Sequence, residues 1–196
     1  MTRPKQIKFR TILMDPPWYE SPFNNVHTYG GGKVKRGVDK HYPLIKHSDM
    51  LPTITNAING KGSIHDDAHC YIWVTNNFLK DGLELMDKLG FRYITNITWV
   101  KDRFGLGQYF RSQHELMLFG VRGKFYRNGT PECSTVIQAK RTKHSRKPVE
   151  AYKQIESISS GPYLELFARN LREGWISWGN EIDEDNNGIE QTRLNV

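Results

Sequence analysis

The apolar run Ile12-Leu13-Met14 is followed by Asp15 and the dipeptide Pro16-Pro17. Proline has no N–H to donate to a sheet and fixes its own φ, so a strand that reaches two prolines has to end there. The strand end then presents a carboxylate and rigid backbone carbonyls, followed by the aromatic pair Trp18-Tyr19. The sequence therefore predicts a buried strand over 9–14 that ends at a polar and aromatic site.

The rest of the chain alternates between apolar runs of strand length and stretches with helical periodicity. This alternation predicts an α/β fold with a mostly parallel sheet, whose ligands bind at the carboxyl ends of the strands. We expect one domain over residues 1–196, without a separate target-recognition domain. The expected helices cover 49–58, 78–89 and 148–158, and the expected strands cover 9–14, 71–74, 93–100, 115–121, 136–137, 163–167 and 175–178.

Composition favours a cytoplasmic protein that meets a polyanion. The chain has 28 Lys and Arg against 21 Asp and Glu, a formal charge of +7, which suits a nucleic-acid partner. Its two cysteines are too few for a disulfide framework, and no apolar run approaches the roughly 20 residues that span a bilayer. We therefore expect no membrane segment. We also expect no metal site, because no residues complete a ligand set around His65 and His69.

The residues at the first strand end suit an enzyme that methylates the exocyclic amine of a nucleobase. Such an amine is a poor nucleophile, because its lone pair is delocalised into the ring, and hydrogen-bond acceptors help to localise it. Asp15 and the carbonyls beside the prolines are acceptors only. Trp18 and Tyr19 can stack on a base, each contact worth about 1–3 kcal/mol. A strand end with a proline turn and a core tryptophan is the structural alternative.

Polar residues also mark two later strand ends and one helix start. Glu165 lies within an apolar strand that is followed by Arg169-Asn170, and Asn180-Glu181 follows the last strand. Acids and amides at such positions can hold ribose hydroxyls and a cofactor amine. Lys147 precedes a helix and can meet an anion, such as the carboxylate of a methionine moiety. Buried acids paired with arginine, and a solvated helix cap, remain the alternatives.

Two basic, glycine-containing loops flank the expected site. Residues 15–44 form a long segment without apolar periodicity, and loops of this length in compact domains are usually functional or disordered. Lys101, Arg111 and His114 surround the second loop, where basic side chains could clamp phosphates. A solvated charged loop is the alternative.

Taken together, these segments resemble the DPPW-type adenine-N6 methyltransferases, which are relatives of the catalytic subunit of the mRNA adenosine methyltransferase and include bacterial and phage DNA-modifying enzymes. The resemblance covers nearly the whole chain, and its order along the sequence makes it far more specific than the four-residue motif. The matching segments are Ile12-Leu13-Met14-Asp15-Pro16-Pro17-Trp18, His41-Tyr42-Pro43, Tyr71-Ile72-Trp73-Val74-Thr75-Asn76, Trp99-Val100-Lys101, Gln113-His114-Glu115, His144-Ser145-Arg146-Lys147-Pro148, Leu164-Glu165-Leu166-Phe167-Ala168-Arg169 and Trp178-Gly179-Asn180-Glu181.

The resemblance implies a Rossmann-like, S-adenosylmethionine-dependent methyltransferase fold, with helices on both faces of the sheet and the catalytic strand first in the chain. It implies the catalytic residues Asp15, Pro16, Pro17 and Trp18. It implies the cofactor-binding residues Asp15, Lys147, Glu165, Leu166, Phe167, Arg169, Asn170, Asn180 and Glu181. Together with the basic loop, it implies the substrate-binding residues Trp18, Tyr19, His41, Tyr42, Lys101, Arg111 and His114. The acidic residue that often precedes the catalytic strand in this family is missing, since residues 1–10 are mostly basic.

The expected substrate is adenine in DNA, because the small size and the lack of an appended recognition domain resemble the bacterial and phage enzymes. RNA is the second candidate. Methylation of cytosine N4 needs the same acceptors, and a non-catalytic nucleic-acid-binding subunit could keep the same fold. We expect a monomer or a homodimer.

Overall fold

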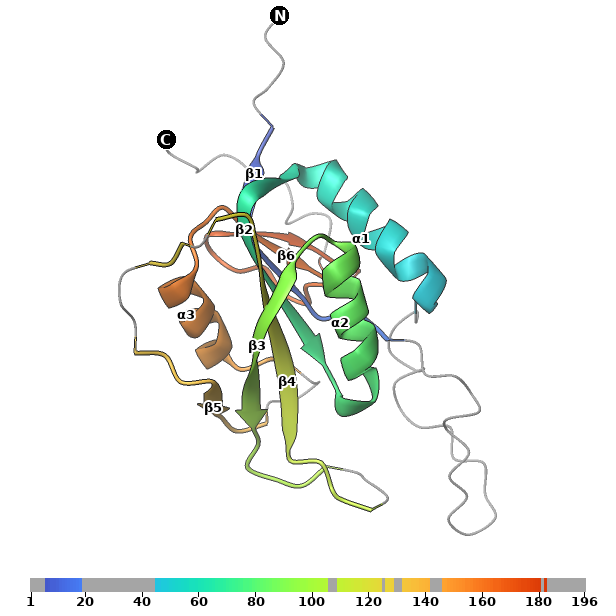
Figure 1. Cartoon of the computed structure of the whole chain (residues 1–196). Coiled ribbons are helices and arrows are strands. Elements are labelled where there is room, and N and C mark those ends of the chain that lie inside the picture. The colour runs from blue at the N-terminus through green and yellow to red at the C-terminus, as the bar shows by residue number, and fades with distance from the viewer. Residues whose placement is uncertain are drawn as a thin grey trace, which may run out of the picture.

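A computed structural model describes residues 6–18, 45–105, 109–124, 126–128, 132–141, 146–180 and 182. Within these residues, the chain forms one mixed sheet with helices against it (Figure 1). The strands are β1 (Lys8–Met14), β2 (Ser63–Val74), β3 (Arg92–Val100), β4 (His114–Arg122), β5 (Val136–Gln138), β6 (Tyr163–Leu166) and β7 (Trp175–Trp178). The helices are α1 (His47–Lys61), the 3-10 turn η1 (Asn76–Phe78), α2 (Leu79–Lys88) and α3 (Val149–Ile158).

The seven strands are arranged in the order β5-β3-β4-β2-β1-β6-β7. Only β4 runs antiparallel to its neighbours, and the pairs β1 with β2, β1 with β6, β6 with β7 and β3 with β5 are parallel. The predicted mostly parallel α/β sheet is therefore confirmed. The first strand lies inside the sheet, between β2 and β6, so residues after Met14 emerge among the carboxyl ends of its neighbours.

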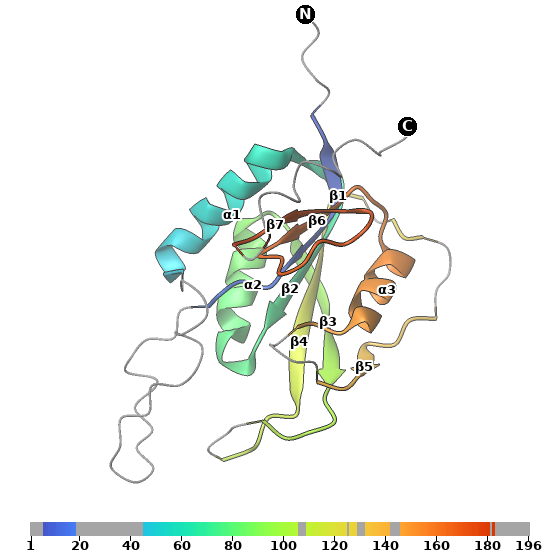
Figure 2. The ribbon, with the colours of Figure 1, turned by 180° about the vertical axis from the view of Figure 1, so that it is seen from behind.

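Helices cover both faces of the sheet. The apolar sides of α1 and α2 pack on one face, where Ile54 and Met86 are fully buried. The opposite face holds α3, whose Ala151 and Ile155 are fully buried (Figure 2). Close packing of α2 depends on Gly82, because a Cβ there would lie 2.5 Å from a methyl group of Val74.

The alternation of side chains along β1 assigns its residues to these two cores. Ile12 and Met14 belong to the core under α1 and α2, whereas Leu13 belongs to the core under α3. Because successive strand residues point to opposite faces, the residue after Met14 turns toward the α3 side. The alternation along β1 therefore places Asp15 on the face of the sheet that α3 covers, near Lys147.

Two predicted elements are longer than expected. Helix α1 covers His47–Lys61 rather than 49–58, and β2 begins at Ser63 rather than at residue 71. The first half of β2 is polar, and it is held as a strand by pairing, since Ser63 is in register with Lys8 of β1 and Ala68 with Arg122 of β4. No helix among the described residues combines the length and the apolar character that crossing a membrane requires.

A buried polar cluster connects β2 to the end of α3. The Ser159 hydroxyl lies 2.7 Å from Nδ1 of His69 and 2.8 Å from the hydroxyl of Tyr71, and the His69 ring stacks on Tyr126 with centroids 4.1 Å apart. His69 is 2% exposed. Burial penalises the imidazolium and lowers the pKa of His69 to about 4, although a backbone hydrogen bond at Tyr126 opposes this shift.

We expect His69 to make the protein acid-sensitive. Between the unfolded pKa of about 6.5 and the folded pKa of about 4, the proton binds only the unfolded chain, so stability falls as pH falls. From pH 7.5 to pH 5.0 this group should remove about 2 kcal/mol from the free energy of unfolding. Urea denaturation of the native protein and of His69→Gln at both pH values isolates the effect, because the other titrating groups are shared. Equal losses in the two proteins would contradict it.

Candidate active site

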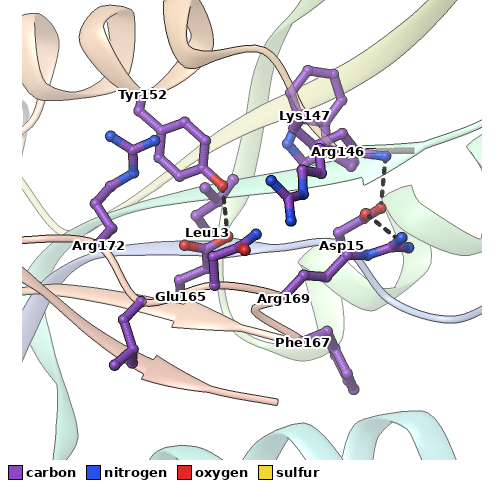
Figure 3. Close-up of a pocket in the computed structure, with 12 residues that line it drawn as sticks. Leu13, Asp15, Arg146, Lys147, Tyr152, Glu165, Phe167, Arg169 and Arg172 are labelled. Carbon is purple, nitrogen blue, oxygen red and sulfur yellow. Dashed lines mark hydrogen bonds and ion pairs between the residues drawn. The ribbon is translucent and has the colours of Figure 1, made fainter. Parts of the chain in front are cut away.

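A cavity of about 360 Å³ opens where β1 and β6 end, beneath the start of α3 (Figure 3). Its size suits a small organic ligand, and its wall combines cationic, acidic and aromatic side chains. The lining residues are Leu13, Asp15, Trp73, Arg146, Lys147, Tyr152, Glu165, Phe167, Arg169, Asn170, Leu171 and Arg172.

Strand register explains why these side chains meet. In β6, Leu164 and Leu166 are buried in the core under α1 and α2, so Glu165 between them points to the α3 side. Glu165 is in register with Leu13 of β1, two residues before Asp15. Both carboxylates therefore line the same face of the sheet, at neighbouring strand ends.

A chain of ion pairs passes through the cavity wall. The Nζ of Lys147 lies 3.0 Å from Oδ1 of Asp15 and 3.0 Å from Oε2 of Glu115. The other oxygen of Glu115 accepts a short hydrogen bond from Nζ of Lys101. The guanidinium of Arg169 lies 4.0 Å from Oδ2 of Asp15. Five charged groups are thus linked in one chain, in which Lys147 joins Asp15 to Glu115.

The ion pairs keep Glu115 and Lys147 charged despite their burial. Burial alone would raise the pKa of Glu115, but the ammonium groups of Lys147 and Lys101 outweigh it and lower the pKa to about 2. Burial alone would lower the pKa of Lys147, but Asp15 and Glu115 raise it above its usual value. The indole of Trp73 adds a cation–π contact, with Nζ of Lys147 5.2 Å from the ring centroid.

The second carboxylate of the cavity is held differently. Tyr152 donates a hydrogen bond of 2.7 Å to Oε1 of Glu165, and the guanidinium carbon of Arg172 lies 3.6 Å from the centroid of the tyrosine ring. Burial raises the pKa of Glu165 to about 7, although the hydrogen bond from Tyr152 and the charge of Arg172 oppose the shift. Glu165 therefore changes its charge near neutral pH, whereas Glu115 stays ionised.

The residues after Asp15 are anchored by hydrogen bonds. The Pro16 carbonyl accepts the N–H of Trp18 at 2.9 Å, and the Pro17 carbonyl accepts the N–H of Ile45 at 3.2 Å. The indole N–H of Trp18 donates to the Trp73 carbonyl at 3.3 Å, and its ring stacks on Phe78 with centroids 5.6 Å apart. Trp18 thus braces the turn that follows the strand, in agreement with the structural alternative for this residue.

The turn after β6 is shaped by unusual backbone. Phe167 has a φ of 60°, a conformation that bulky residues rarely adopt, and it contacts Trp178 edge to face with centroids 5.4 Å apart. The following N–H, of Ala168, donates to the Trp178 carbonyl at 2.9 Å. A Cβ at Gly179 would lie 2.1 Å from the Ala168 carbonyl oxygen, so only glycine fits there. This packing directs Arg169 and Asn170 to the cavity.

The structure brings together six of the residues predicted to bind a cofactor, namely Asp15, Lys147, Glu165, Phe167, Arg169 and Asn170. The side chain of Leu166 lies in the core, and Asn180 is exposed and absent from the lining. Pro16, Pro17 and Trp18 are also absent from it. Arg111 lies in the loop between β3 and β4, and His114 is the first residue of β4. The roles of all these residues stay predictions. Four more predicted residues, Tyr19, His41, Tyr42 and Glu181, lie outside the described residues.

Sequence reasoning did not assign Glu115, Tyr152 and Arg172 to the site. Glu115 opens an apolar strand, and only its contacts with two lysines reveal that it is held at the cavity. Tyr152 fits the apolar side of a helix equally well. The hydroxyl of Tyr152 could have indicated a role in the site, because a buried tyrosine hydroxyl usually needs a hydrogen-bond partner.

Comparison with known proteins identifies related sequences. The model of the MT-A70 family matches residues 9–181. Similar proteins include a putative N(6)-adenosine-methyltransferase MT-A70-like from Medicago truncatula (28% identity, 89% of this chain, 26% of the relative), the type II methyltransferase M.MunI from Mycoplasma sp. (27%, 91% and 79%) and the human N(6)-adenosine-methyltransferase catalytic subunit METTL3 (27%, 90% and 28%). The chain thus spans about a quarter of the plant and human relatives and most of M.MunI.

Removing the charge of Lys147 should destabilise the fold. Lys147→Met removes the cation between two carboxylates in a partly buried site, since each lay 3.0 Å from the lost nitrogen. Breaking a fully buried pair costs about 3–5 kcal/mol, so we expect a loss at the lower end of this range, about 3 kcal/mol, which urea denaturation at pH 7.5 would measure. Lys80→Met is the matched control, because Lys80 is exposed and pairs with Glu84 at 4.0 Å, and it should change stability by less than about 0.5 kcal/mol. Equal effects of the two substitutions would contradict the ion-pair argument.

Proposed function

The chain belongs to the MT-A70 family of S-adenosylmethionine-dependent methyltransferases, and on this premise we propose that it transfers a methyl group to N6 of adenine in DNA. The observation that carries the proposal is the position of Asp15, which directly follows the interior strand β1 and lines a cavity with charged walls. Residues 1–196 would act as one methyltransferase domain.

The donor set of the cavity fits S-adenosylmethionine. Lys147 and Arg169 can bind the carboxylate of its methionine part, and the Glu165 carboxylate can accept hydrogen bonds from ribose hydroxyls. Trp73 and Phe167 add aromatic wall, and Asp15 offers negative charge near the sulfonium. When bound, the cofactor supplies the electrophilic methyl group.

The acceptors around Asp15 would serve the target amine. Positive charge develops on N6 as the methyl group is transferred, and a fixed carboxylate stabilises it without reorganisation. The Pro16 carbonyl uses one lone pair for the N–H of Trp18 and has a second for an amine hydrogen. The contacts of Asp15 with Lys147 and Arg169 hold its side chain in one orientation, which favours alignment of the reactants.

DNA is favoured over RNA by the relative M.MunI, a type II methyltransferase, which matches this chain at 27% identity. The N(6)-adenosine-methyltransferases from Medicago truncatula and human match it at 28% and 27% identity. A base inside a duplex would have to be flipped out, at a cost of a few kcal/mol that is smaller for a single strand. RNA adenosine is the second candidate substrate, because the N(6)-adenosine-methyltransferases match this chain at about the same sequence identity as M.MunI does.

Two other functions fit parts of the site. Cytosine N4 needs the same acceptors, and analysis of the methylated nucleoside separates it from adenine N6. A non-catalytic nucleic-acid-binding subunit would keep the fold, but the charged cavity with Asp15 and Lys147 argues against it, since binding alone does not require buried ion pairs.

The proposal predicts that Asp15→Asn lowers methyl transfer at least about 100-fold while the fold stays intact, because a single charge-stabilising group is lost. The measurement is transfer from labelled S-adenosylmethionine to single-stranded DNA, duplex DNA and RNA of matched sequence, followed by digestion to nucleosides. Product on DNA made only by the native protein would support the proposal. Product made equally by Asp15→Asn would refute the role of this carboxylate, and native protein that neither binds cofactor nor forms product would favour the non-catalytic subunit.

Glu165 should make cofactor binding depend on pH. Its pKa of about 7 leaves it mostly protonated at pH 6 and ionised at pH 8, and the ionised form accepts more hydrogen bonds from hydroxyls. The affinity for S-adenosylhomocysteine should therefore rise about tenfold over this interval, as isothermal calorimetry can measure. In Glu165→Gln the affinity should be lower and nearly independent of pH. A native profile that is flat, or that falls as pH rises, would contradict this role.

A further inference from the structure

The hairpin loop that joins β3 to β4 exposes an unusual set of aromatic side chains. Tyr109 is 93% exposed, Phe110 91% and Phe104 58%, the largest exposed fractions among the large apolar side chains of the described residues. We call these three residues the aromatic tip. Figure 1 shows the loop extending beyond the carboxyl end of β3, at the lower edge of the sheet. Clustered exposed apolar surface usually marks an interaction site.

The described parts of the loop are braced by hydrogen bonds. The N–H of Lys101 donates to the Gln113 carbonyl at 2.8 Å, and Nε2 of Gln113 donates to the Lys101 carbonyl at 3.0 Å. Farther out, Nε of Arg111 donates to the Gly105 carbonyl at 3.1 Å, and its guanidinium carbon lies 5.4 Å from the centroid of the Phe104 ring. A braced loop presents its rings at a lower entropic cost than a free one.

The base of the loop is joined to the candidate active site. Lys101 directly follows β3, and its ammonium group donates a hydrogen bond to Glu115. Glu115 in turn contacts Lys147 in the cavity wall. The aromatic tip therefore extends from the same edge of the sheet at which Asp15 lies. A polymer whose target base enters the cavity would pass its neighbouring nucleotides along this edge.

The charge of the loop selects the kind of partner. The loop, residues 101–113, contains the basic residues Lys101, Arg103 and Arg111 and one acidic residue, Asp102, which pairs with Arg103 at 3.6 Å, within a chain of net charge +7. Exposed aromatic rings combined with guanidinium groups are the features that bind unstacked nucleobases and their phosphates. Resting on the proposed function, we infer that the aromatic tip stacks against unpaired bases that flank the target base.

The test is binding of a fluorescein-labelled 12-nucleotide single strand, as DNA and as RNA, with the duplex of the same sequence as a third probe. Tyr109→Ala/Phe110→Ala should raise Kd for the single strand at least about tenfold. Its effect on the salt dependence of binding should be small, because no charge changes. Tyr93→Ala is the matched control, since Tyr93 is 41% exposed near the opposite end of β3, and it should leave Kd unchanged. Comparison of Kd for the DNA strand with Kd for the RNA strand shows which of the two sugars the protein prefers.

An unchanged Kd in the double variant would overturn the inference. The inference would also be overturned if the double variant lost a dimer in sedimentation analysis but kept its nucleic-acid binding, because the tip would then contact a second copy of this chain. Methyl transfer by the native protein is measured separately: transfer with no effect of the tip overturns only this inference, whereas tip-dependent binding without transfer supports it and refutes the proposed function.

Discussion

The ammonium group of Lys147 is the contact on which the candidate site depends. It joins Asp15 at the end of β1 to Glu115 at the start of β4, from a position directly before α3. Two partly buried carboxylates this close would repel each other without a cation between them. Placement of α3 and orientation of the Asp15 carboxylate are therefore parts of one interaction, which would tie the proposed methyl transfer to the stability of the fold.

Much of the fold follows from local patterns in the sequence. The proline pair ends β1, and the alternation of apolar runs with amphipathic helices places the elements correctly. The period of two along β1 and β6 then sends Asp15 and Glu165 to the same face. The polar first half of β2 could not be recognised in this way, because it is held by pairing with Lys8 and other residues distant in the chain.

The site was harder to predict than the sheet, for a related reason. Lys147 and Asp15 were identified from their positions at element ends, but Glu115 and Tyr152 gain their roles from contacts with residues 32 and 13 positions away. Trp18 shows the opposite case. An aromatic residue beside a catalytic motif suggests base stacking, yet its ring packs on Phe78 and its N–H is used by the backbone, so its observed contacts brace the turn.

The proposed methyl transfer and the proposed binding of a strand place opposite physical demands on two separate regions of this structure. Stabilising a developing charge requires groups that are buried and fixed, because water would weaken the field of Asp15 and reorganise around it. Engaging a strand requires rings that are exposed before binding, as Tyr109 and Phe110 are. Lys101 connects the two regions, since it closes the hairpin with Gln113 and pairs with Glu115 at the cavity. A nucleotide that moves the hairpin would therefore act on the same ion pairs that orient Asp15.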